Sequence, residues 1–133
     1  MRRIIMSSLD LARIREKIKE VSDKNVYIMR EIERLQEELN RARVVKPHQV
    51  PSDVIAMHSM VTVAYLSTGK EFAIRLVYPE EANVRKNRVS VFAPVGAALL
   101  GYRKGDTIHW NAPGGKIKIK VKDVVSDAMP VGV

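Results

Sequence analysis

The 133-residue sequence contains no cysteine, and only 5% of its residues are aromatic. Without cysteine there is no disulfide framework, and no thiolate is available for zinc binding or nucleophilic catalysis. No apolar run approaches the roughly 20 residues that a membrane-spanning helix needs. The first segment, MRRIIMSSLD, has too short an apolar patch for a secretory signal. These absences predict a cytoplasmic protein that does not span a membrane.

The sequence also lacks the residue patterns of a catalytic or cofactor site. His48, His58 and His109 are far apart along the chain and form no metal-binding pattern. There is no glycine-rich phosphate loop and no catalytic-triad spacing, and the segment NAPGG (111–115) is typical of a hairpin turn. We therefore expect neither a catalytic residue nor a bound metal or cofactor.

Positive charge, by contrast, is in excess: 23 Lys and Arg stand against 15 Asp and Glu, which gives a net charge of +8. Residues 1–46 contain 12 basic and 8 acidic residues, and residues 47–133 contain 11 and 7, so each part carries an excess of +4. No single tail holds the charge. It is compatible with proximity to nucleic acid without sequence-specific binding, and equally with an ordinary soluble basic protein.

Two stripes of apolar residues at spacings of three and four indicate two helices within residues 1–46. The first helix begins after Ser7 or Ser8, either of which suits the N-cap, and the second covers about residues 25–43. The turn formers of VSDKN separate them, so the helices should fold back as an antiparallel helical hairpin, a short coiled coil. The two apolar stripes consist of Leu11, Ile14, Ile18 and Val21, and of Ile28, Ile32, Leu35, Leu39 and Ala42.

After a linker over residues 47–59, which contains Pro47 and Pro51, the apolar period changes to two. This period predicts β-strands in a domain over residues 60–133, and hence an α+β fold. We expect a four- or five-stranded antiparallel sheet, with strands at 60–66, 71–78, 88–92, 106–110 and 116–125.

The stretch APVGAALLGYRKGD (93–106) holds a short apolar run between glycines. Pro94 suits the first position of a helix, and Gly101 suits the left-handed position that follows a helix end. The stretch therefore predicts about two helical turns that cover one face of the sheet, with Leu99 and Leu100 in the core.

Lysines alternate with apolar residues in the last expected strand, so that one face of the strand is apolar and the other is basic. Such a row would protect a sheet edge against aggregation. We interpret it first as a solvated face, and contact with nucleic acid or with a polymerase is the alternative. The row consists of Lys116, Lys118, Lys120 and Lys122.

Several motifs follow one another in a fixed order: LVYPEEAN (76–83), a strand that ends in Ala93-Pro94, AALLG (97–101), Gly105-Asp106 and PGG (113–115). Over about residues 47–130 the chain thereby resembles the C-terminal domain of the bacterial Gre transcript-cleavage factors. The segments APVG (93–96) and IHW (108–110) are most similar to the Rnk group within that family, known as regulators of nucleoside diphosphate kinase. The helical hairpin ahead of the domain fits the same family plan.

The resemblance implies an FKBP-like fold for the C-terminal domain, with a bent antiparallel sheet around a short helix. It also implies RNA polymerase as the partner, with the domain docked on the rim of the secondary channel and the hairpin pushed into the channel. The loop that makes the rim contact in the cleavage factors corresponds here to Ser90, Phe92 and Pro94. Phe92 replaces an acidic residue of the cleavage factors, whereas Rnk-like members have an apolar residue there. An exposed Phe92 would be an anchor for the partner, and a buried one would be part of the core.

Cleavage factors carry an Asp and a Glu three residues apart at the hairpin tip, where the two carboxylates hold a second Mg²⁺ ion. In this sequence Val26 stands three residues after Asp23, and Lys24 would oppose cation capture. Asp23 fits the role of a helix cap. Glu20 has the right spacing from Asp23, but it would end the first helix. The predicted tip consists of Ser22, Asp23, Lys24 and Asn25.

This tip favours a non-enzymatic, Rnk-like transcription elongation regulator that binds RNA polymerase at the secondary channel and competes with other channel factors. The alternative is a Gre-type cleavage factor that stimulates the polymerase to hydrolyse backtracked RNA. A peptidyl-prolyl isomerase, suggested by the fold alone, would need an aromatic-lined pocket. Direct regulation of nucleoside diphosphate kinase is suggested only by the name of the group. The oligomeric state, and whether the hairpin packs on the C-terminal domain, are left open.

Overall fold

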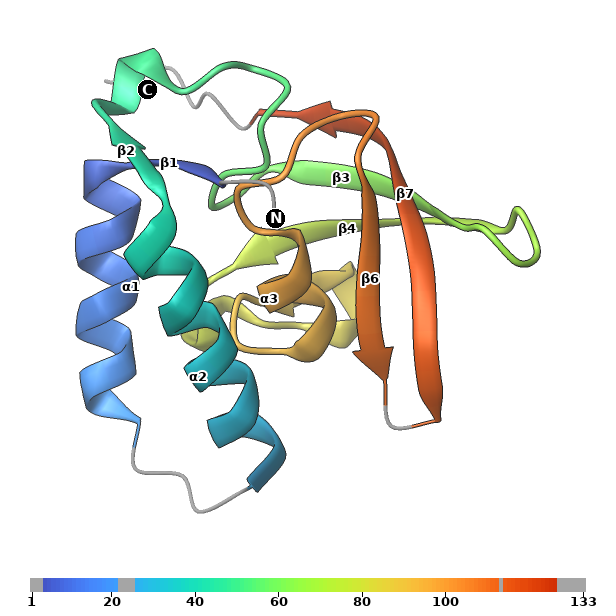
Figure 1. Ribbon diagram of the computed structural model, residues 1–133, viewed down its shortest axis with the longest axis horizontal. Helices are drawn as coiled ribbons and strands as arrows, with labels where there is room; N and C mark the ends of the chain where they lie inside the picture. The colour runs from blue at the N-terminus through green and yellow to red at the C-terminus, as the bar shows by residue number, and fades with distance from the viewer. Residues whose placement is uncertain (1–3, 22–25, 113, 127–133) are drawn as a thin grey trace.

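A helical hairpin lies beside a five-stranded sheet, with a short helix between them, in the computed structural model of the chain (Figure 1). The structure describes residues 4–21, 26–112 and 114–126. Helix α1 (Ser8–Glu20) and helix α2 (Val26–Arg41) form the hairpin, as the apolar spacing predicts. None of the helices in these ranges has the length and the hydrophobicity needed to cross a bilayer.

The predicted N-cap of the first helix is confirmed at Ser7. Its side-chain oxygen accepts a hydrogen bond from the backbone N–H of Asp10 at 2.9 Å, which satisfies one of the amides left free at a helix start. The predicted apolar seam is also confirmed, because Ile14, Ile32 and Leu35 are all at most 3% exposed. The hairpin therefore hides an apolar face from water instead of standing free.

A two-stranded parallel sheet closes the base of the hairpin and was not expected from the sequence. Strand β1 (Ile5–Ser7) precedes α1, and strand β2 (Arg43–Val45) follows α2. The N–H of Ile5 also donates to the carbonyl of Gly101 at 3.2 Å. Gly101 has a φ of +82°, and a Cβ atom there would lie 2.4 Å from the Cβ atom of Ile4. The hairpin base and the end of the short helix thus meet at a position that only glycine fits.

The expected strands are present, but the sheet is mixed rather than antiparallel. Strands β4 and β5 run parallel, because two 3₁₀ turns between them bring the chain back beside the second half of β4, where Arg88 lies opposite Arg75. These turns are η2 (Pro79–Glu81) and η3 (Val84–Lys86). The strands are β3 (Met60–Tyr65), β4 (Glu71–Val77), β5 (Arg88–Ser90), β6 (Thr107–Ala112) and β7 (Gly115–Val125), in the spatial order β5-β4-β3-β7-β6.

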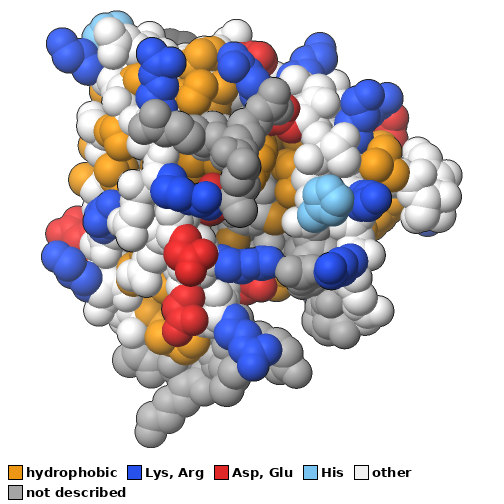
Figure 2. All heavy atoms as spheres, in the orientation of Figure 1, with side chains coloured by type: hydrophobic (Ala, Val, Ile, Leu, Met, Phe, Trp, Pro, Cys, Tyr) orange, Lys and Arg blue, Asp and Glu red, His pale blue; other side chains and the backbone are white. Residues whose placement is uncertain are grey.

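Strand β7 is an inner strand of this sheet, so the predicted protection of a sheet edge by its lysines is wrong. The alternation of its side chains is interrupted once, where Val121 pairs with Val63 but Asp123 pairs with Thr62. Lys122 is therefore the additional residue of a β-bulge. The bulge lets Val121 and Val124, three residues apart, both point into the core. Figure 2 shows basic side chains along the side of the molecule where β6 and β7 lie.

The predicted short helix is confirmed as α3 (Pro94–Leu99), with proline in its first turn. Leu99 and Leu100 are at most 1% exposed, so their predicted core position is confirmed. The helix lies close against β5, because a Cβ atom on Gly96 would be only 2.1 Å from the carbonyl oxygen of Ser90. Glycine at position 96 therefore fixes the distance between α3 and the end of β5.

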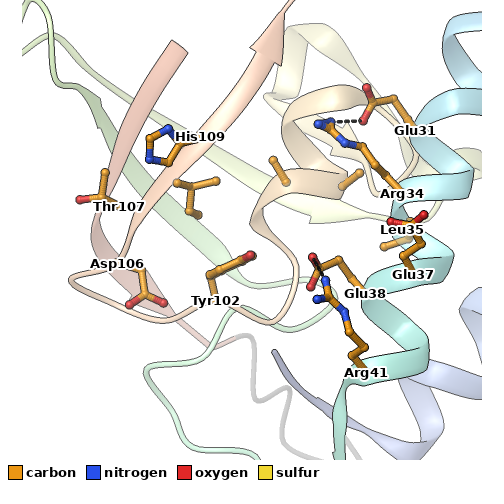
Figure 3. Close-up of a pocket in the computed structure, with 13 residues that line it drawn as sticks. Glu31, Arg34, Leu35, Glu37, Glu38, Arg41, Tyr102, Asp106, Thr107 and His109 are labelled. Atoms are coloured by element: carbon orange, nitrogen blue, oxygen red, sulfur yellow. Dashed lines mark hydrogen bonds and ion pairs between the residues drawn. The ribbon is translucent and has the colours of Figure 1, made fainter. Parts of the chain in front are cut away.

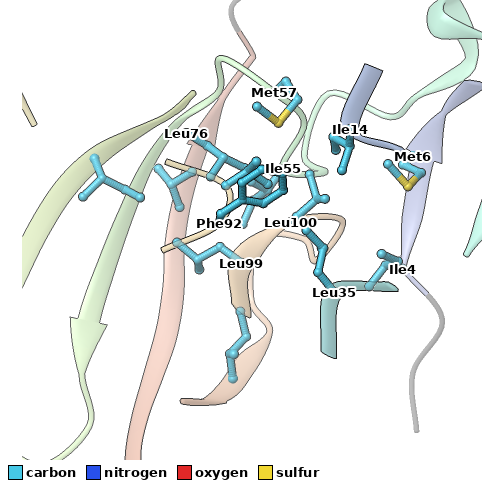
Figure 4. Close-up of a cluster of buried hydrophobic side chains, with 14 of the residues drawn as sticks. Ile4, Met6, Ile14, Leu35, Ile55, Met57, Leu76, Phe92, Leu99 and Leu100 are labelled. Carbon is cyan, nitrogen blue, oxygen red and sulfur yellow. The ribbon is translucent and has the colours of Figure 1, made fainter. Parts of the chain in front are cut away.

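A single hydrophobic cluster joins the hairpin, the linker and the sheet (Figure 4). The hairpin therefore packs against the C-terminal part, which answers the question that the sequence left open. Fully burying one such side chain contributes about 1.5–3 kcal/mol. The labelled members of the cluster are Ile4, Met6, Ile14, Leu35, Ile55, Met57, Leu76, Phe92, Leu99 and Leu100.

Residues 47–59 are attached to this core at several points. After the 3₁₀ turn η1 (Pro47–Gln49), the carboxylate of Asp53 accepts two hydrogen bonds from the guanidinium of Arg103, at 3.2 and 3.1 Å. The N–H of Ile55 donates to the carbonyl of Tyr102 at 2.7 Å, and Ile55 itself is fully buried. The segment thus holds a fixed course between the hairpin and β3.

Candidate partner-binding groove

An apolar groove of about 680 Å³ lies where the far ends of α1 and α2 meet the segment around β5 and η2. We call it the junction groove. Apolar side chains from both parts of the chain line it, and charged side chains stand at its border. It is lined by Lys17, Glu20, Val21, Ile28, Glu31, Pro79, Glu80, Ser90, Phe92, Ala93 and Pro94.

The three residues predicted for the polymerase contact, Ser90, Phe92 and Pro94, all line this groove. Phe92 is only 6% exposed, and Figure 4 shows it among the core residues Ile55 and Leu76. Of the two positions considered for Phe92, the structure thus has the buried one. Its remaining exposed surface forms part of the groove, and it is not a projecting anchor.

Hydrogen bonds hold the backbone of this segment in place. The hydroxyl of Ser90 accepts from the N–H of Phe92 at 3.0 Å, and the carbonyl of Ser90 accepts from the N–H of Ala93, also at 3.0 Å. The N–H of Val91 donates to the carbonyl of Val77 at 2.8 Å. Together with the close approach of Gly96, these bonds give this wall of the groove a defined shape.

An ion pair spans the border of the groove, between Lys17 on α1 and Glu80 on η2, at 2.6 Å. The hydrogen bond to Lys17 lowers the pKa of the Glu80 carboxyl, and the same bond raises the pKa of Lys17. Lys17 also lies 3.8 Å from Glu20, one turn along its own helix. The pair connects the helical wall of the groove with the wall formed by the C-terminal part.

His58 supports η2 from the side of the linker. Its Nε2 atom lies 2.8 Å from a carboxylate oxygen of Glu81, and the same oxygen accepts from the N–H of Tyr78 at 3.2 Å. The ring of His58 meets the ring of Tyr78 edge to face at 5.7 Å. The guanidinium of Arg75 donates to the carbonyl of His58 at 2.7 Å. These contacts hold Pro79 and Glu80, which line the groove, in their positions.

The backbone of His58 has a φ of +70°, a left-handed conformation that is uncommon for any residue with a Cβ atom. Such a conformation costs about 1–2 kcal/mol. The contacts of the His58 side chain and carbonyl offset this cost. Close by, burial raises the pKa of Tyr78 to about 12, and burial also raises the pKa of Asp10 against the opposing effect of the Met57 N–H. The role of His58 and Tyr78 is therefore structural: they lie behind the groove and support the η2 turn.

A second cleft, of about 570 Å³, lies on the other side of α2, between α2 and β6 (Figure 3). Its helical wall carries charges of both signs in pairs, with Arg34 at 3.5 Å from Glu31 and Arg41 at 2.8 Å from Glu38. His109 lines the opposite wall and is exposed, as the strand alternation predicts. This mixture of charges favours neither an anionic nor a cationic ligand.

The predicted hairpin tip, Ser22, Asp23, Lys24 and Asn25, lies outside the residues that the structure describes. The prediction that Asp23 is a helix cap therefore stays a prediction. Glu20 is the last residue of α1, as expected, and its carboxylate faces Lys17. Within the described ranges, no three His, Asp or Glu side chains are grouped so that they could hold a metal ion.

Sequence reasoning found one wall of the groove and missed the other. Val21 and Ile28 belong to the apolar seam of the hairpin, and nothing in that spacing separates seam residues at a groove from those in a core. The acidic turn PEE (79–81) was part of the family motif, but its pairing with Lys17 depends on how the hairpin packs. That packing was the question the sequence left open.

Comparison with known proteins gives consistent matches. The family model for the C-terminal domain of the transcription elongation factors GreA and GreB matches residues 50–126. The regulator of nucleoside diphosphate kinase from Escherichia coli strain K12 is 41% identical over 112 residues, which cover 84% of this chain and 80% of that protein. The transcription elongation factor GreA from Syntrophotalea carbinolica is 33% identical over 102 residues, which cover 77% of this chain and 63% of that protein.

The fold is similar to that of a solved structure as well. The prokaryotic transcription elongation factor GreA/GreB from Nitrosomonas europaea is 35% identical and superposes with a TM-score of 0.77. The superposition covers 95% of this chain and 100% of the other, so the likeness includes both the hairpin and the sheet.

Proposed function

Because this chain belongs to the GreA/GreB family of transcription elongation factors, we propose that it binds RNA polymerase at the rim of the secondary channel. In this proposal it is a Rnk-like regulator that works in the cytoplasm and is not an enzyme. The observation that carries the proposal is the position of Ser90, Phe92 and Pro94, which the resemblance assigns to the polymerase contact. All three line one apolar groove.

The junction groove has the features of a protein-binding site. Contact energy between proteins concentrates where an apolar side chain of one partner fills a pocket of the other, within a border that excludes water. Val21, Phe92 and Pro94 supply apolar lining, and the ion pair of Lys17 with Glu80 stands at the border. A side chain of the polymerase that fills the groove would contact the hairpin and the sheet together, and would thereby fix the direction of the hairpin.

The hairpin supplies the second part of the proposed mechanism. Helix α2 has 16 residues, so it extends about 24 Å at 1.5 Å per residue. We propose that the hairpin acts as a short coiled coil that enters the channel, and that the domain over residues 60–133 is FKBP-like, joined to the hairpin (1–46) by the linker (47–59). With Leu35 and Ile14 buried in the shared core, the hairpin keeps its orientation when the groove is occupied.

We propose that this chain does not stimulate transcript cleavage, because of the residues at its hairpin tip. Two carboxylates at the required spacing are what would hold a second Mg²⁺ ion, and here Val26 stands in the place of the second acid. The test uses backtracked polymerase complexes with the wild-type chain and with Asp23→Ala. We expect neither protein to stimulate cleavage. Strong cleavage that disappears in Asp23→Ala would instead establish a Gre-type cleavage factor.

Ala93→Arg tests docking at the groove, because the long charged side chain would occupy it without removing a core residue. The matched control is Ala73→Arg, an equal change at an exposed position on β4. We expect Ala93→Arg to weaken binding to purified RNA polymerase by at least tenfold, or about 1.4 kcal/mol, and Ala73→Arg to bind like the wild type. Equal midpoints of thermal unfolding for both variants would verify that neither substitution disturbs the fold. Unchanged binding by Ala93→Arg would refute docking at this groove.

A further inference from the structure

The lysines of β7 form a regular row on the face of the sheet that points away from the core. Lys116, Lys118 and Lys120 are all exposed, whereas Ile119 and Val121, on the opposite face, are fully buried. Alternate residues of a strand are about 6.6–6.8 Å apart. Lys122, the residue added by the bulge, continues the exposed row. The row is about 20 Å long, from residue 116 to residue 122.

The described residues around the row leave its charge uncompensated. Its neighbours on the same face are Thr107, opposite Lys120, and His109, opposite Lys118. Within the described part of the chain, none of the four lysines forms an ion pair. Asp123, the acidic residue that follows the row in sequence, lies 3.6 Å from Lys104 instead.

Among the described residues, the next acidic side chain on this face is that of Glu71, which lies opposite Ala64, and Ala64 lies opposite Lys120. Glu71 is thus two strand spacings from Lys120, or about 10 Å. At that distance salt screens most of the attraction between exposed charges. Glu71 therefore does little to neutralise the row.

Neither packing nor edge protection explains these lysines. Strand β7 has a neighbour on each side, and helices α1, α2 and α3 all lie on the other face of the sheet (Figure 1). Like charges at this spacing repel one another, so the row does not stabilise the fold. Binding of an anion of matching shape to such a surface is favourable, because it releases counterions into the solvent.

We propose that the open face of β6 and β7 binds the phosphate backbone of a single nucleic-acid strand through this row of lysines. Lysine presents a compact positive charge without the planar fork of arginine, so it suits phosphates and carries no base recognition. A straight row fits an extended single strand, whereas the phosphates of a duplex wind away from it. Binding at this face is therefore independent of sequence and strongly dependent on salt.

This inference does not rest on the proposed binding to polymerase. The junction groove lies beside β5, and the lysine row lies on β7 beside β6, at the opposite end of the strand order. One ligand can therefore occupy each surface without contact between them. Nucleic-acid binding is also measured without polymerase, so the two proposals fail separately.

The experiment measures fluorescence anisotropy of a labelled oligouridylate with the full chain, at about 50 and 200 mM salt. Four phosphate contacts to a single strand predict that affinity falls about 50-fold between these two salt concentrations. Replacing three of the contacts should weaken binding at low salt and reduce that fall to about threefold. The variant is the triple Lys116→Gln, Lys118→Gln, Lys120→Gln.

The matched control replaces Lys19, Lys46 and Lys86 by Gln, which gives the same net charge at exposed positions elsewhere. Retained affinity and salt dependence in this control would support the inference. Equal loss in both triples would overturn it, because only the total charge would then matter. Tighter binding of a duplex of the same length, or no binding of the single strand at low salt, would also overturn it. The inference would also be overturned if the triple lysine variant kept its affinity for the oligouridylate but lost its affinity for RNA polymerase, because the face would then contact protein.

Discussion

Charged side chains are arranged differently at the two ends of the sheet. At the β5 end, polar side chains are paired across structural elements: Lys17 forms an ion pair with Glu80 at 2.6 Å, and the ring of His58 is hydrogen-bonded to Glu81 at 2.8 Å. The Lys17–Glu80 pair stands at the border of the junction groove, and the His58–Glu81 pair supports the η2 turn behind it. At the β6–β7 end, the lysines of β7 form an exposed row, and none of them has an ion-pair partner among the described residues. In our two proposals, the β5 end binds an apolar side chain of a protein partner, and the β6–β7 end binds a polyanion.

Leu35→Ala tests whether the groove end depends on the shared core. Leu35 is 1% exposed on α2, so its truncation should lower the free energy of unfolding by about 2–5 kcal/mol. The matched control, Leu66→Ala, lies next to β7 and is 49% exposed, so it should change stability by less than about 0.5 kcal/mol. Urea unfolding followed by circular dichroism measures both. A loss in Leu35→Ala no larger than in Leu66→Ala would mean that the hairpin is not anchored.

Gly96→Ala tests the fixed shape of the groove wall. The added methyl group would clash with the carbonyl of Ser90, so the end of β5 must move, at a cost of about 1–3 kcal/mol. Gly114→Ala is the matched change at the β6–β7 end, where nothing lies within 4 Å of the added atom. We expect Gly96→Ala to lower the thermal midpoint and to weaken polymerase binding, and Gly114→Ala to do neither. Equal midpoints for the two variants would contradict the close packing of α3 on β5.

Of these substitutions, Lys17→Met should change the stability least, and the change should appear in the pH dependence of stability. Because Lys17 holds the folded-state pKa of Glu80 below its ordinary value of 4.5, the pair stabilises the fold above that value. This contribution is lost as the pH falls through the lowered pKa, when Glu80 takes up a proton. Between neutral pH and acid below 4.5, the wild type should therefore lose more stability than Lys17→Met. Lys118→Met, from the lysine row, should follow the wild-type profile. A wild-type profile in Lys17→Met would argue against a stabilising pair.

Much of the fold follows from local sequence signals. The apolar period of two located the five strands, Ser7 was a recognisable cap, and Pro94 and Gly101 bounded α3. The α+β class follows from the change of period after the hairpin. These features are predictable because each depends on residues close together in the chain.

Features that depend on distant contacts were not predictable. Strands β1 and β2 have three residues each, too few for a periodic pattern, and they form because the hairpin base meets Gly101. The parallel course of β5 depends on two 3₁₀ turns. One missed feature had a signal, since Val121 and Val124, both apolar and three residues apart, mark the bulge at Lys122.

The candidate site was predictable only in part. The family resemblance singled out Ser90, Phe92 and Pro94, and the structure brings them to one groove. It did not indicate that Phe92 would be buried, because its exposure depends on contacts with residues distant in the chain, such as Ile55 and Leu76. The helical wall, with Val21 and Ile28, follows from the same packing.

Crosslinking from single cysteines tests the central claim most directly. The natural chain has no cysteine, so a photoactivatable crosslinker attached to Ala93→Cys or to Ala73→Cys reports on one position only. We expect the groove position, Ala93→Cys, to crosslink to RNA polymerase, and the exposed sheet position, Ala73→Cys, to give no product. Efficient crosslinking from Ala73→Cys with none from Ala93→Cys would show that the polymerase contacts another surface, and would contradict docking at the junction groove.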